Sequence, residues 1–166
     1  MSGMEIERKF LVRKDRDYKG QAFASSRIKQ GYIAAKGATV RVRLRNDKGY
    51  LTIKGPSMDG GLSRYEFEKE ITVEEAAQLF KLCAPGVIDK TRYLVHSGKH
   101  TFEVDEFYGE NEGLVMAEVE LGSADEEFVK PDFIGLEVTG DSRFTNRSLR
   151  KIPFMLLRAT VPPEYR

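Results

Sequence analysis

Residues 4–12, MEIERKFLV, alternate charged and apolar side chains. Glu5, Glu7 and Lys9 fall two residues apart, and Ile6 and Phe10 occupy alternate positions of the same segment. Successive side chains of a β-strand point to opposite faces of the sheet. The segment therefore predicts a strand with one charged and one largely apolar face. Its charged face either meets water or lines a site, and the other strands decide which.

The same alternation recurs in short segments along the chain. Strands are predicted at 4–12, 27–35, 39–46, 50–54, 64–72, 88–96, 101–107 and 114–121. Turn residues such as AsnAspLysGly at 46–49 separate neighbouring segments, and short connections predict antiparallel pairing. Helices are predicted at 73–83, 123–130 and 141–151. No repeat or linker interrupts the pattern, so we expect a single domain over residues 1–166.

Composition limits the classes of partner. The chain has 166 residues, and its 27 basic residues are balanced by 26 acidic ones, so a general nucleic-acid-coating protein is not expected. No apolar run approaches membrane-spanning length, so no membrane partner is expected either. A single cysteine, Cys83, fits a reducing compartment, and no apolar leader precedes Glu5. The cytoplasm is therefore the expected location.

Charges on the alternating strand faces are sorted by sign. The clearest basic and acidic rows are Arg41, Arg43 and Arg45, and Glu66, Glu68 and Glu70. Like charges about 7 Å apart on one strand face repel each other, so each row is costly unless a counter-ion lies over it. A solvated outer face is the ordinary explanation for any single strand. The sorting across several strands instead favours two halves of one binding site.

Eight short antiparallel strands with few helices predict an α+β protein that is mainly antiparallel β. Closing these strands into an eight-stranded β-barrel would gather both signs of charge around one lumen, with a few helices at its flanks. The apolar strand faces would then point outward. They would need cover from the helices at 73–83 and 141–151, or from a second subunit in a homodimer.

The charged residues match the chemistry of a phosphate chain. Arginine and lysine bind phosphate oxygens, and the candidates are Lys9, Arg43, Arg45, Lys54, Lys90 and Arg92. Paired carboxylates suit hard cations such as Mg²⁺ or Mn²⁺, and the candidates are Glu5, Glu7, Glu118 and Glu120. Metal ions that bridge phosphate oxygens and activate a water molecule hydrolyse phosphoanhydrides.

The ordered motifs resemble those of the CYTH, or triphosphate tunnel metalloenzyme, family. GluIleGluArgLys at 5–9 is similar to the ExExK signature of that family. The further segments that match in order are GlnGlyTyr at 30–32, ValArgLeuArg at 42–45, LeuThrIleLys at 51–54, GlyGlyLeuSerArg at 60–64, LysThrArgTyr at 90–93, PheGluValAsp at 102–105, GluValGluLeu at 118–121 and ValThrGlyAspSerArgPheThrAsn at 138–146. The resemblance covers Met4 to about Ile152 and is greatest to short bacterial inorganic triphosphatases.

The resemblance implies a role for each site residue. Glu5, Glu7 and Glu120 would hold the metal ion that organises triphosphate, and Asp105 and Glu118, with Glu68, would hold a second that activates water. The six cations would grip the phosphates, whereas Arg41 extends the basic face beyond the family pattern. Tyr32 together with Lys9 would assist hydrolysis, and Arg143 would lie at one tunnel mouth.

Three other functions fit the same residues. The tunnel could serve an adenylate cyclase, or an enzyme that hydrolyses thiamine or nucleoside triphosphates. It could bind polyphosphate or a nucleotide without catalysis, although pure binding does not require so many carboxylates. A structural barrel with a solvated charged face remains if the strands never close.

Overall fold

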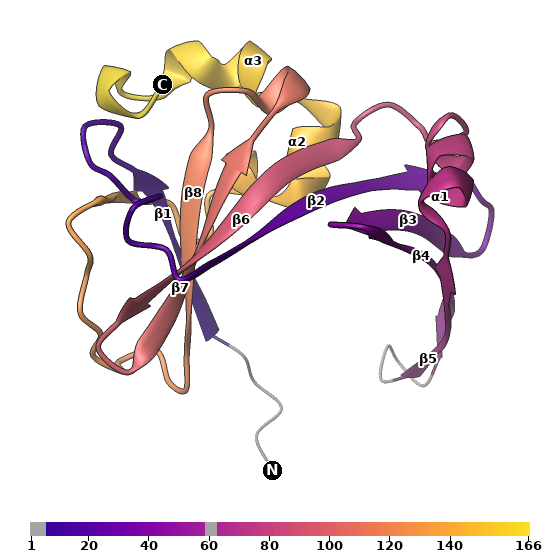
Figure 1. Ribbon diagram of the computed structural model, residues 1–166, viewed down its shortest axis with the longest axis horizontal. Coiled ribbons are helices and arrows are strands. Elements are labelled where there is room, and N and C mark those ends of the chain that lie inside the picture. The colour runs from indigo at the N-terminus through magenta and orange to yellow at the C-terminus, as the bar shows by residue number, and fades with distance from the viewer. Residues whose placement is uncertain (1–5, 59–62) are drawn as a thin grey trace. The chain divides into compact units, whose positions relative to one another are not determined.

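The computed structural model describes residues 6–58 and 63–166, which form two compact units. Unit 1 holds residues 6–26 and 90–166, and unit 2 holds residues 27–89. Both consist mainly of antiparallel strands with few helices, as the sequence predicts (Figure 1). Each unit is described by itself below.

The sheet of unit 1 has five strands. In spatial order they are β6 (Ile88–Ser97), β7 (His100–Phe107), β8 (Val115–Leu121), β1 (Ile6–Val12) and β9 (Ile134–Glu137). Strand β9 was not predicted from the sequence. It has only four residues and contains Gly135, and glycine weakens the strand signal because it has no side chain to pack. Pairing with β1, in which Phe10 lies opposite Glu137, stabilises β9 nonetheless.

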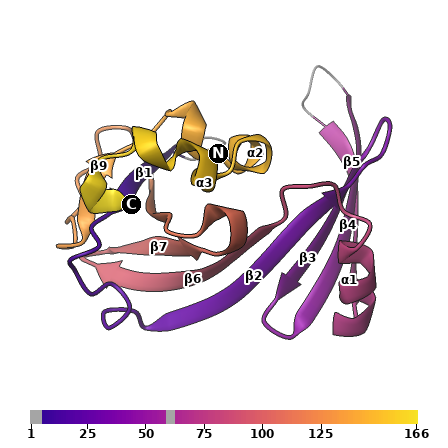
Figure 2. The same ribbon diagram turned by 90° about the horizontal axis from the view of Figure 1, so that it is seen from above.

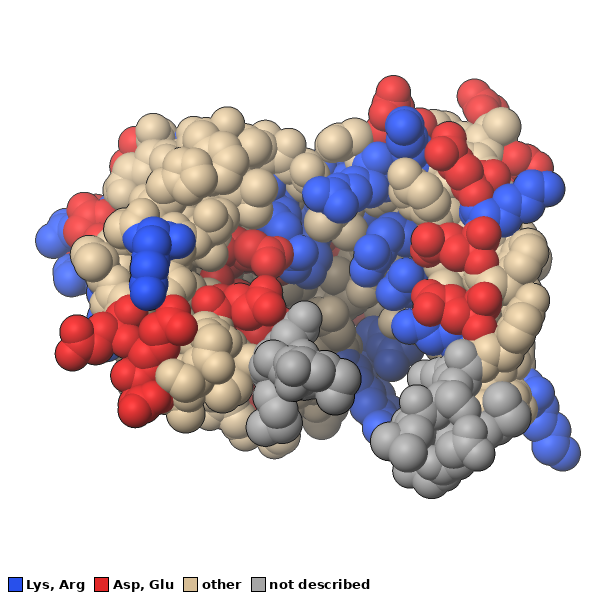
Figure 3. Space-filling model, turned by 90° about the horizontal axis from the view of Figure 1, so that it is seen from below, with Lys and Arg blue, Asp and Glu red and all other residues tan. Residues whose placement is uncertain are grey.

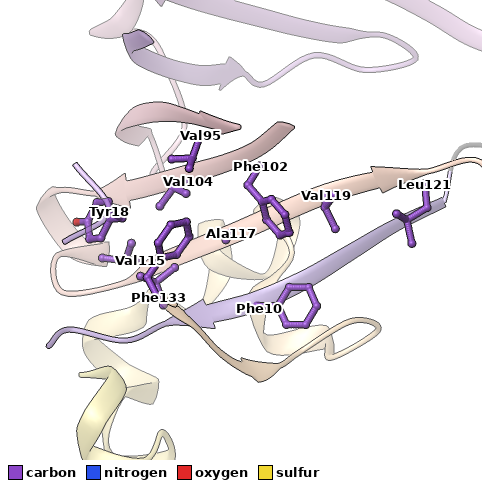
Figure 4. Packing of buried hydrophobic residues seen from close by; sticks show 11 residues of the cluster. Phe10, Tyr18, Val95, Phe102, Val104, Val115, Ala117, Val119, Leu121 and Phe133 are labelled. Atoms are coloured by element: carbon purple, nitrogen blue, oxygen red, sulfur yellow. The ribbon is translucent and has the colours of Figure 1, made fainter. Parts of the chain in front are cut away.

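One face of this sheet carries the hydrophobic core of unit 1. Figure 4 shows the cluster, which includes Phe10 of β1, Phe102 of β7 and Val119 of β8, all almost fully buried. Tyr18 and Phe133, from the segments that follow β1 and β8, complete the same cluster. Loop side chains therefore cover this apolar face, and the charged side chains at alternate positions, such as Lys9, Asp105 and Glu118, occupy the opposite face.

Unit 2 is a four-stranded sheet with one helix. Its elements are β2 (Ala24–Ile33), β3 (Thr39–Arg45), β4 (Lys48–Met58), β5 (Ser63–Ile71) and α1 (Val73–Phe80), with the strands in the order β5-β4-β3-β2. The helix packs against β3 and β4, where Val42 and Ala76 are fully buried. Thr72 caps its start, because the Thr72 hydroxyl accepts from the Glu75 amide and the Glu75 carboxylate accepts from the Thr72 amide.

Two helix predictions need correction. Helix α1 ends at Phe80 rather than at Cys83, because the amides of residues 81–83 bond carbonyls three residues back, which tightens the chain into turns. The predicted helix at 123–130 is wrong, since this segment forms a turn and an irregular loop. The Glu126 carboxylate bonds His100 and the Gly122 amide, and these contacts replace helical hydrogen bonding.

The C-terminal region is divided into short helices. Their bounds are η3 (Ser142–Phe144), α2 (Asn146–Lys151), α3 (Phe154–Leu157), η4 (Arg158–Thr160) and η5 (Pro163–Tyr165), and η2 (Gly109–Asn111) lies earlier in the chain. The predicted single helix over 141–151 is interrupted because Thr145 is extended and caps α2. Phe144 and Asn146 line a pocket on the charged face (Figure 2 shows α2 and α3 from above), so this region does not cover the apolar face as predicted.

The predicted strands all form, but their closure is not seen. Within the part of the chain that the structure describes, β5 pairs only with β4 and β9 only with β1. The sheet is therefore open, and the eight-stranded barrel stays a prediction. No helix among the described residues is long and apolar enough to cross a membrane.

Candidate active site

Unit 1 places charged side chains on the face of its sheet opposite to the hydrophobic core. Lys9 of β1 lies opposite Glu118 of β8, and Arg92 of β6 lies opposite Asp105 of β7. The charged residues that line a pocket here are Lys9, Lys90, Arg92, Glu103, Asp105 and Glu118. The pocket has a volume of about 60 Å³, which is room for a few water molecules. A larger anion would have to extend beyond it.

Asp105 is the centre of a buried ion-pair network. Its Oδ2 atom accepts from Lys90 Nζ at 2.8 Å and from Arg92 Nη2 at 3.0 Å, and its Oδ1 atom accepts from Arg92 Nε at 2.8 Å. Burial opposes ionisation of Asp105, but these two cations outweigh it and lower the pKa of the carboxyl. The carboxylate therefore stays charged and holds both cations in place.

Arg92 and Lys9 of this pocket also lie close to further carboxylates. Arg92 Nη1 lies 2.5 Å from Glu103 Oε2, and Lys9 Nζ lies 3.6 Å from Glu118 Oε1. Burial is the largest single influence and disfavours the charged guanidinium of Arg92, but the hydrogen bonds to Asp105 and the nearby carboxylate charges together outweigh burial and raise the pKa of Arg92. Every cation of this pocket is thus oriented by a carboxylate of a neighbouring strand.

Glu118 also meets a second carboxyl group. Burial raises the pKa of Glu118, and a hydrogen bond to Glu7 and the charge of Glu7 raise it further. Glu120 lies directly opposite Glu7 on the neighbouring strand. A divalent cation would relieve the repulsion between such carboxylates and take oxygen ligands from them, so this donor set fits Mg²⁺ or Mn²⁺.

The structure describes only part of the predicted metal site. Glu5 lies outside the described residues. Within residues 6–58 and 63–166, no three carboxylate, imidazole or thiol groups lie close enough together to hold a metal ion. Glu7 and Glu118 form a pair, and a third ligand would come from Glu120, which lies opposite Glu7, or from Glu5.

Unit 2 carries a ladder of charged and polar side chains on one face of its sheet. The rows, read across β2, β3, β4 and β5, are Tyr32–Arg41–Thr52–Glu68, Gln30–Arg43–Tyr50–Glu70 and, from β3 to β5, Thr39–Lys54–Glu66. Basic and acidic side chains lie next to each other over this part of the molecule in Figure 3. The face combines arginines from one strand with carboxylates from another.

Buried polar groups anchor the first row. Thr52 is 1% exposed, and its hydroxyl donates to Glu68 Oε1 at 2.7 Å. Arg41 Nη2 lies 3.9 Å from the same Glu68 oxygen. The Nε atom of Arg41 is buried and has no hydrogen-bond partner among the described residues. Glu68 is therefore held at the edge of the basic row.

The second row contains a contact between an amide and an arginine. Gln30 is 5% exposed, and its Oε1 atom accepts from Arg43 Nε at 3.1 Å and from Arg43 Nη2 at 2.9 Å. One edge of the guanidinium thus lies against a single carbonyl oxygen. Sequence reasoning treated Gln30 only as part of a motif and gave its side chain no task.

The structure brings the predicted site residues together in two sets. Unit 1 holds Glu7, Lys9, Lys90, Arg92, Asp105, Glu118 and Glu120, and unit 2 holds Tyr32, Arg43, Arg45, Lys54 and Glu68. Lys9 and Tyr32 belong to different units, so their joint action stays a prediction. Arg143 donates to Asp141 and to Thr160 Oγ1 at 3.0 Å and does not line the pocket, so its contact with substrate also stays a prediction.

Glu103, Gln30 and Thr52 contribute contacts to these faces but were not predicted as site residues. Glu103 lies two residues before Asp105 and therefore on the same strand face, a signal that the alternation already contained. Gln30 and Thr52 follow the same rule within β2 and β4. Gln30 and Thr52 are neutral, so a search for charged residues does not find them.

Comparison with known proteins gives consistent results. The CYTH domain model matches residues 3–146. An inorganic triphosphatase of Acetivibrio thermocellus is 52% identical over 154 residues, which is 92% of this chain and 96% of that protein. An inorganic triphosphatase of Nitrosomonas europaea is 37% identical over 153 residues, 87% of this chain and 95% of that protein. The crystal structure of the inorganic triphosphatase NE1496 superimposes with a TM-score of 0.74 at 30% identity, covering 90% of this chain and 95% of that one.

Proposed function

This chain belongs to the CYTH family, and we propose that it hydrolyses inorganic triphosphate to diphosphate and phosphate in a metal-dependent reaction. The observation that carries the proposal is the 52% identity to an inorganic triphosphatase over 92% of the chain. The chemistry of the site supports the proposal, because unit 1 offers paired carboxylates and both units offer cations on the charged strand faces. Triphosphate needs both kinds of group.

The carboxylates would bind the metal ion. Glu7, Glu118 and Glu120, together with Glu5, would hold Mg²⁺ or Mn²⁺, which would neutralise phosphate charge and supply an activated water molecule. Asp105 and Glu68 are proposed as ligands of a second metal ion. In the structure Asp105 bonds Lys90 and Arg92, and Glu68 accepts from Thr52, so each would bind a metal ion while keeping these contacts.

The cations would hold the phosphates. The proposed phosphate-binding residues are Lys9, Arg43, Arg45, Lys54, Lys90 and Arg92, with Arg143 at the tunnel mouth. Tyr32 would act with Lys9 on the attacking water or on a phosphate oxygen. These roles require one tunnel, so we also propose that the single domain closes into an eight-stranded barrel. Similarity in fold to the inorganic triphosphatase NE1496 supports this arrangement.

The expected context is a small-molecule enzyme of the cytoplasm. The near balance of charge argues for a small substrate rather than nucleic acid or a membrane surface, and the single cysteine fits a reducing compartment. A homodimer stays a prediction. Its motivation is the exposed aromatic surface of β5, where Tyr65 is 67% and Phe67 is 41% exposed.

Substrate choice is the direct test. The purified chain is incubated with triphosphate, ATP or thiamine triphosphate in the presence of Mg²⁺ or Mn²⁺, and phosphate and cyclic AMP are measured. We expect rapid release of phosphate from triphosphate and little from the other two substrates. Cyclic AMP formed from ATP at a comparable rate would overturn the proposal in favour of a cyclase.

A variant separates catalysis from binding. Glu120→Ala removes one proposed metal ligand and leaves the phosphate-binding cations in place. We expect it to bind triphosphate but to hydrolyse it far more slowly than the parent. If parent and variant bind triphosphate equally well and neither hydrolyses it, the chain is a polyphosphate-binding module.

A further inference from the structure

Gln30 and Arg43 form a side-chain pairing across β2 and β3. The two residues lie directly opposite each other, on the face that also carries Tyr32, Arg41 and Arg45. Gln30 Oε1 accepts from Arg43 Nε at 3.1 Å and from Nη2 at 2.9 Å, so the contact fixes one whole edge of the guanidinium. Gln30 is 5% exposed, which means that water does not compete effectively for its carbonyl oxygen.

We propose that Gln30 is a positioning residue that orients the Arg43 guanidinium for binding triphosphate. The inference rests on the proposed function, because Arg43 is itself a proposed phosphate ligand. An arginine side chain loses considerable rotamer entropy when it is fixed on a ligand. Gln30 fixes the direction of the guanidinium before substrate arrives, so less of that entropy is lost on binding.

The chemistry of the acceptor distinguishes Gln30 from the partners in unit 1. There, Asp105 takes the same edge of Arg92, with Nε–Oδ1 at 2.8 Å and Nη2–Oδ2 at 3.0 Å. A carboxylate orients an arginine but also cancels its charge. The amide of Gln30 has no net charge, so this contact orients Arg43 without itself cancelling the arginine charge.

A purely structural role makes different predictions. A buried amide needs a partner, and Arg43 would then serve Gln30 rather than the reverse. Removing the amide would in that case change stability without changing the affinity for triphosphate. The two roles therefore separate in KM, whereas the Arg43 Nε–H group reports only whether the contact exists.

The first experiment compares three variants by triphosphate hydrolysis and thermal melting. Gln30→Met keeps the length of the side chain and removes the acceptor, and we expect kcat/KM to fall by about 2- to 12-fold, mainly through KM. Gln30→Glu keeps the acceptor and adds a charge, so we expect an oriented but neutralised Arg43 and again a higher KM. Lys29→Gln is the control, since Lys29 lies on the opposite face of β2 over the ring of Phe80. It should match the parent.

The second experiment asks whether Gln30 acts through Arg43. In an Arg43→Ala background, Gln30→Met should have no further effect on kcat/KM, because the group that it orients is gone. If Gln30→Met lowers kcat/KM by the same factor in both backgrounds, the positioning role is overturned. An unchanged KM in Gln30→Met with a lowered melting temperature overturns it as well.

A spectroscopic measurement keeps the inference separate from the proposed function. In protein labelled with ¹⁵N-arginine, the Arg43 Nε–H signal should exchange slowly with water in the parent and in Gln30→Glu. It should exchange fast in Gln30→Met. If Gln30→Met does not fold, a fast-exchanging signal in the parent or in Gln30→Glu still overturns the positioning role. A parent that fails to hydrolyse triphosphate contradicts the proposed function instead.

Discussion

Three consecutive residues of β2 show how much a single position decides. Gln30 accepts hydrogen bonds from Arg43 on the charged face, and Tyr32 lies on the same face opposite Arg41. Gly31 between them faces the other way. A Cβ atom there would come within 2.9 Å of Cys83 Sγ, closer than packing allows. The segment GlnGlyTyr at 30–32 thus places two polar side chains on the charged face, and its glycine lets Cys83, after α1, pack closely against the other face.

Glu118→Gln tests the paired carboxylates. Because burial and Glu7 raise the pKa of Glu118, the ionised carboxylate is less stable in the folded than in the unfolded chain at neutral pH. Glutamine mimics the protonated form and removes that cost. We expect hydrolysis to fall by more than about tenfold, whereas the melting temperature in the absence of divalent metal ions stays equal or rises.

The same variant tests the metal ion directly. Mn²⁺ should raise the melting temperature of the parent, since a ligand that binds only the folded state stabilises it. It should raise that of Glu118→Gln much less. Equal shifts in both proteins would mean that Glu118 is not a ligand.

At the level of elements, an ion pair joins the unpredicted strand β9 to β1 in addition to the backbone pairing. Arg8 of β1 donates to Glu137 from Nε at 2.9 Å and from Nη2 at 2.6 Å. The Thr139 hydroxyl donates to the same carboxylate at 2.7 Å. Nothing in the local sequence indicates this pairing, because the two residues are far apart along the chain.

Glu137→Gln gives a pH-dependent loss of stability. Hydrogen bonds from Arg8 lower the pKa of Glu137 from its usual 4.5 to about 2. The pair therefore stabilises the fold fully above about pH 4.5, and its contribution is lost as the pH falls toward 2. In urea unfolding, the variant should be less stable at pH 7 by up to about 1 kcal/mol, and the difference should disappear near pH 2.

The control for this effect is Glu127→Gln, which makes the same change of charge at an exposed position in the loop after β8. Its stability relative to the parent should vary little between pH 7 and pH 3. A difference for Glu137→Gln that grows as the pH falls would contradict the assignment.

At the level of the whole molecule, charges of both units should serve one ligand. Triphosphate without metal ions should raise the melting temperature of the parent by about 5–11 °C at a hundredfold excess over Kd. Lys9→Ala in unit 1 and Lys54→Ala in unit 2 should each reduce that shift, because each removes a phosphate-binding charge. The melting curves are measured in the presence of a metal chelator to prevent hydrolysis.

The control is Lys99→Ala, which removes an exposed charge from the turn between β6 and β7. It should show the full shift. If Lys54→Ala also shows the full shift, Lys54 does not contribute to triphosphate binding, and the proposed barrel loses this functional support.

The sequence by itself determined every strand except β9, the charged and apolar faces of those strands, and, through the ordered motifs, the family. The strands and their faces follow from local alternation, because side chains in a strand change face at every residue whatever the strand pairs with. The same rule placed Lys9, Arg43, Asp105 and Glu118 on charged faces, where the structure has them. The family resemblance that the ordered motifs carry is confirmed.

Only the tertiary structure decided which groups meet. Register between strands places Asp105 against Lys90 and Arg92, and Gln30 against Arg43. Contacts across more than a hundred residues also create β9, and they bring the C-terminal segment to the charged face. These outcomes depend on the free energy of packing distant segments, and the local alternation of side chains carries no information about that packing.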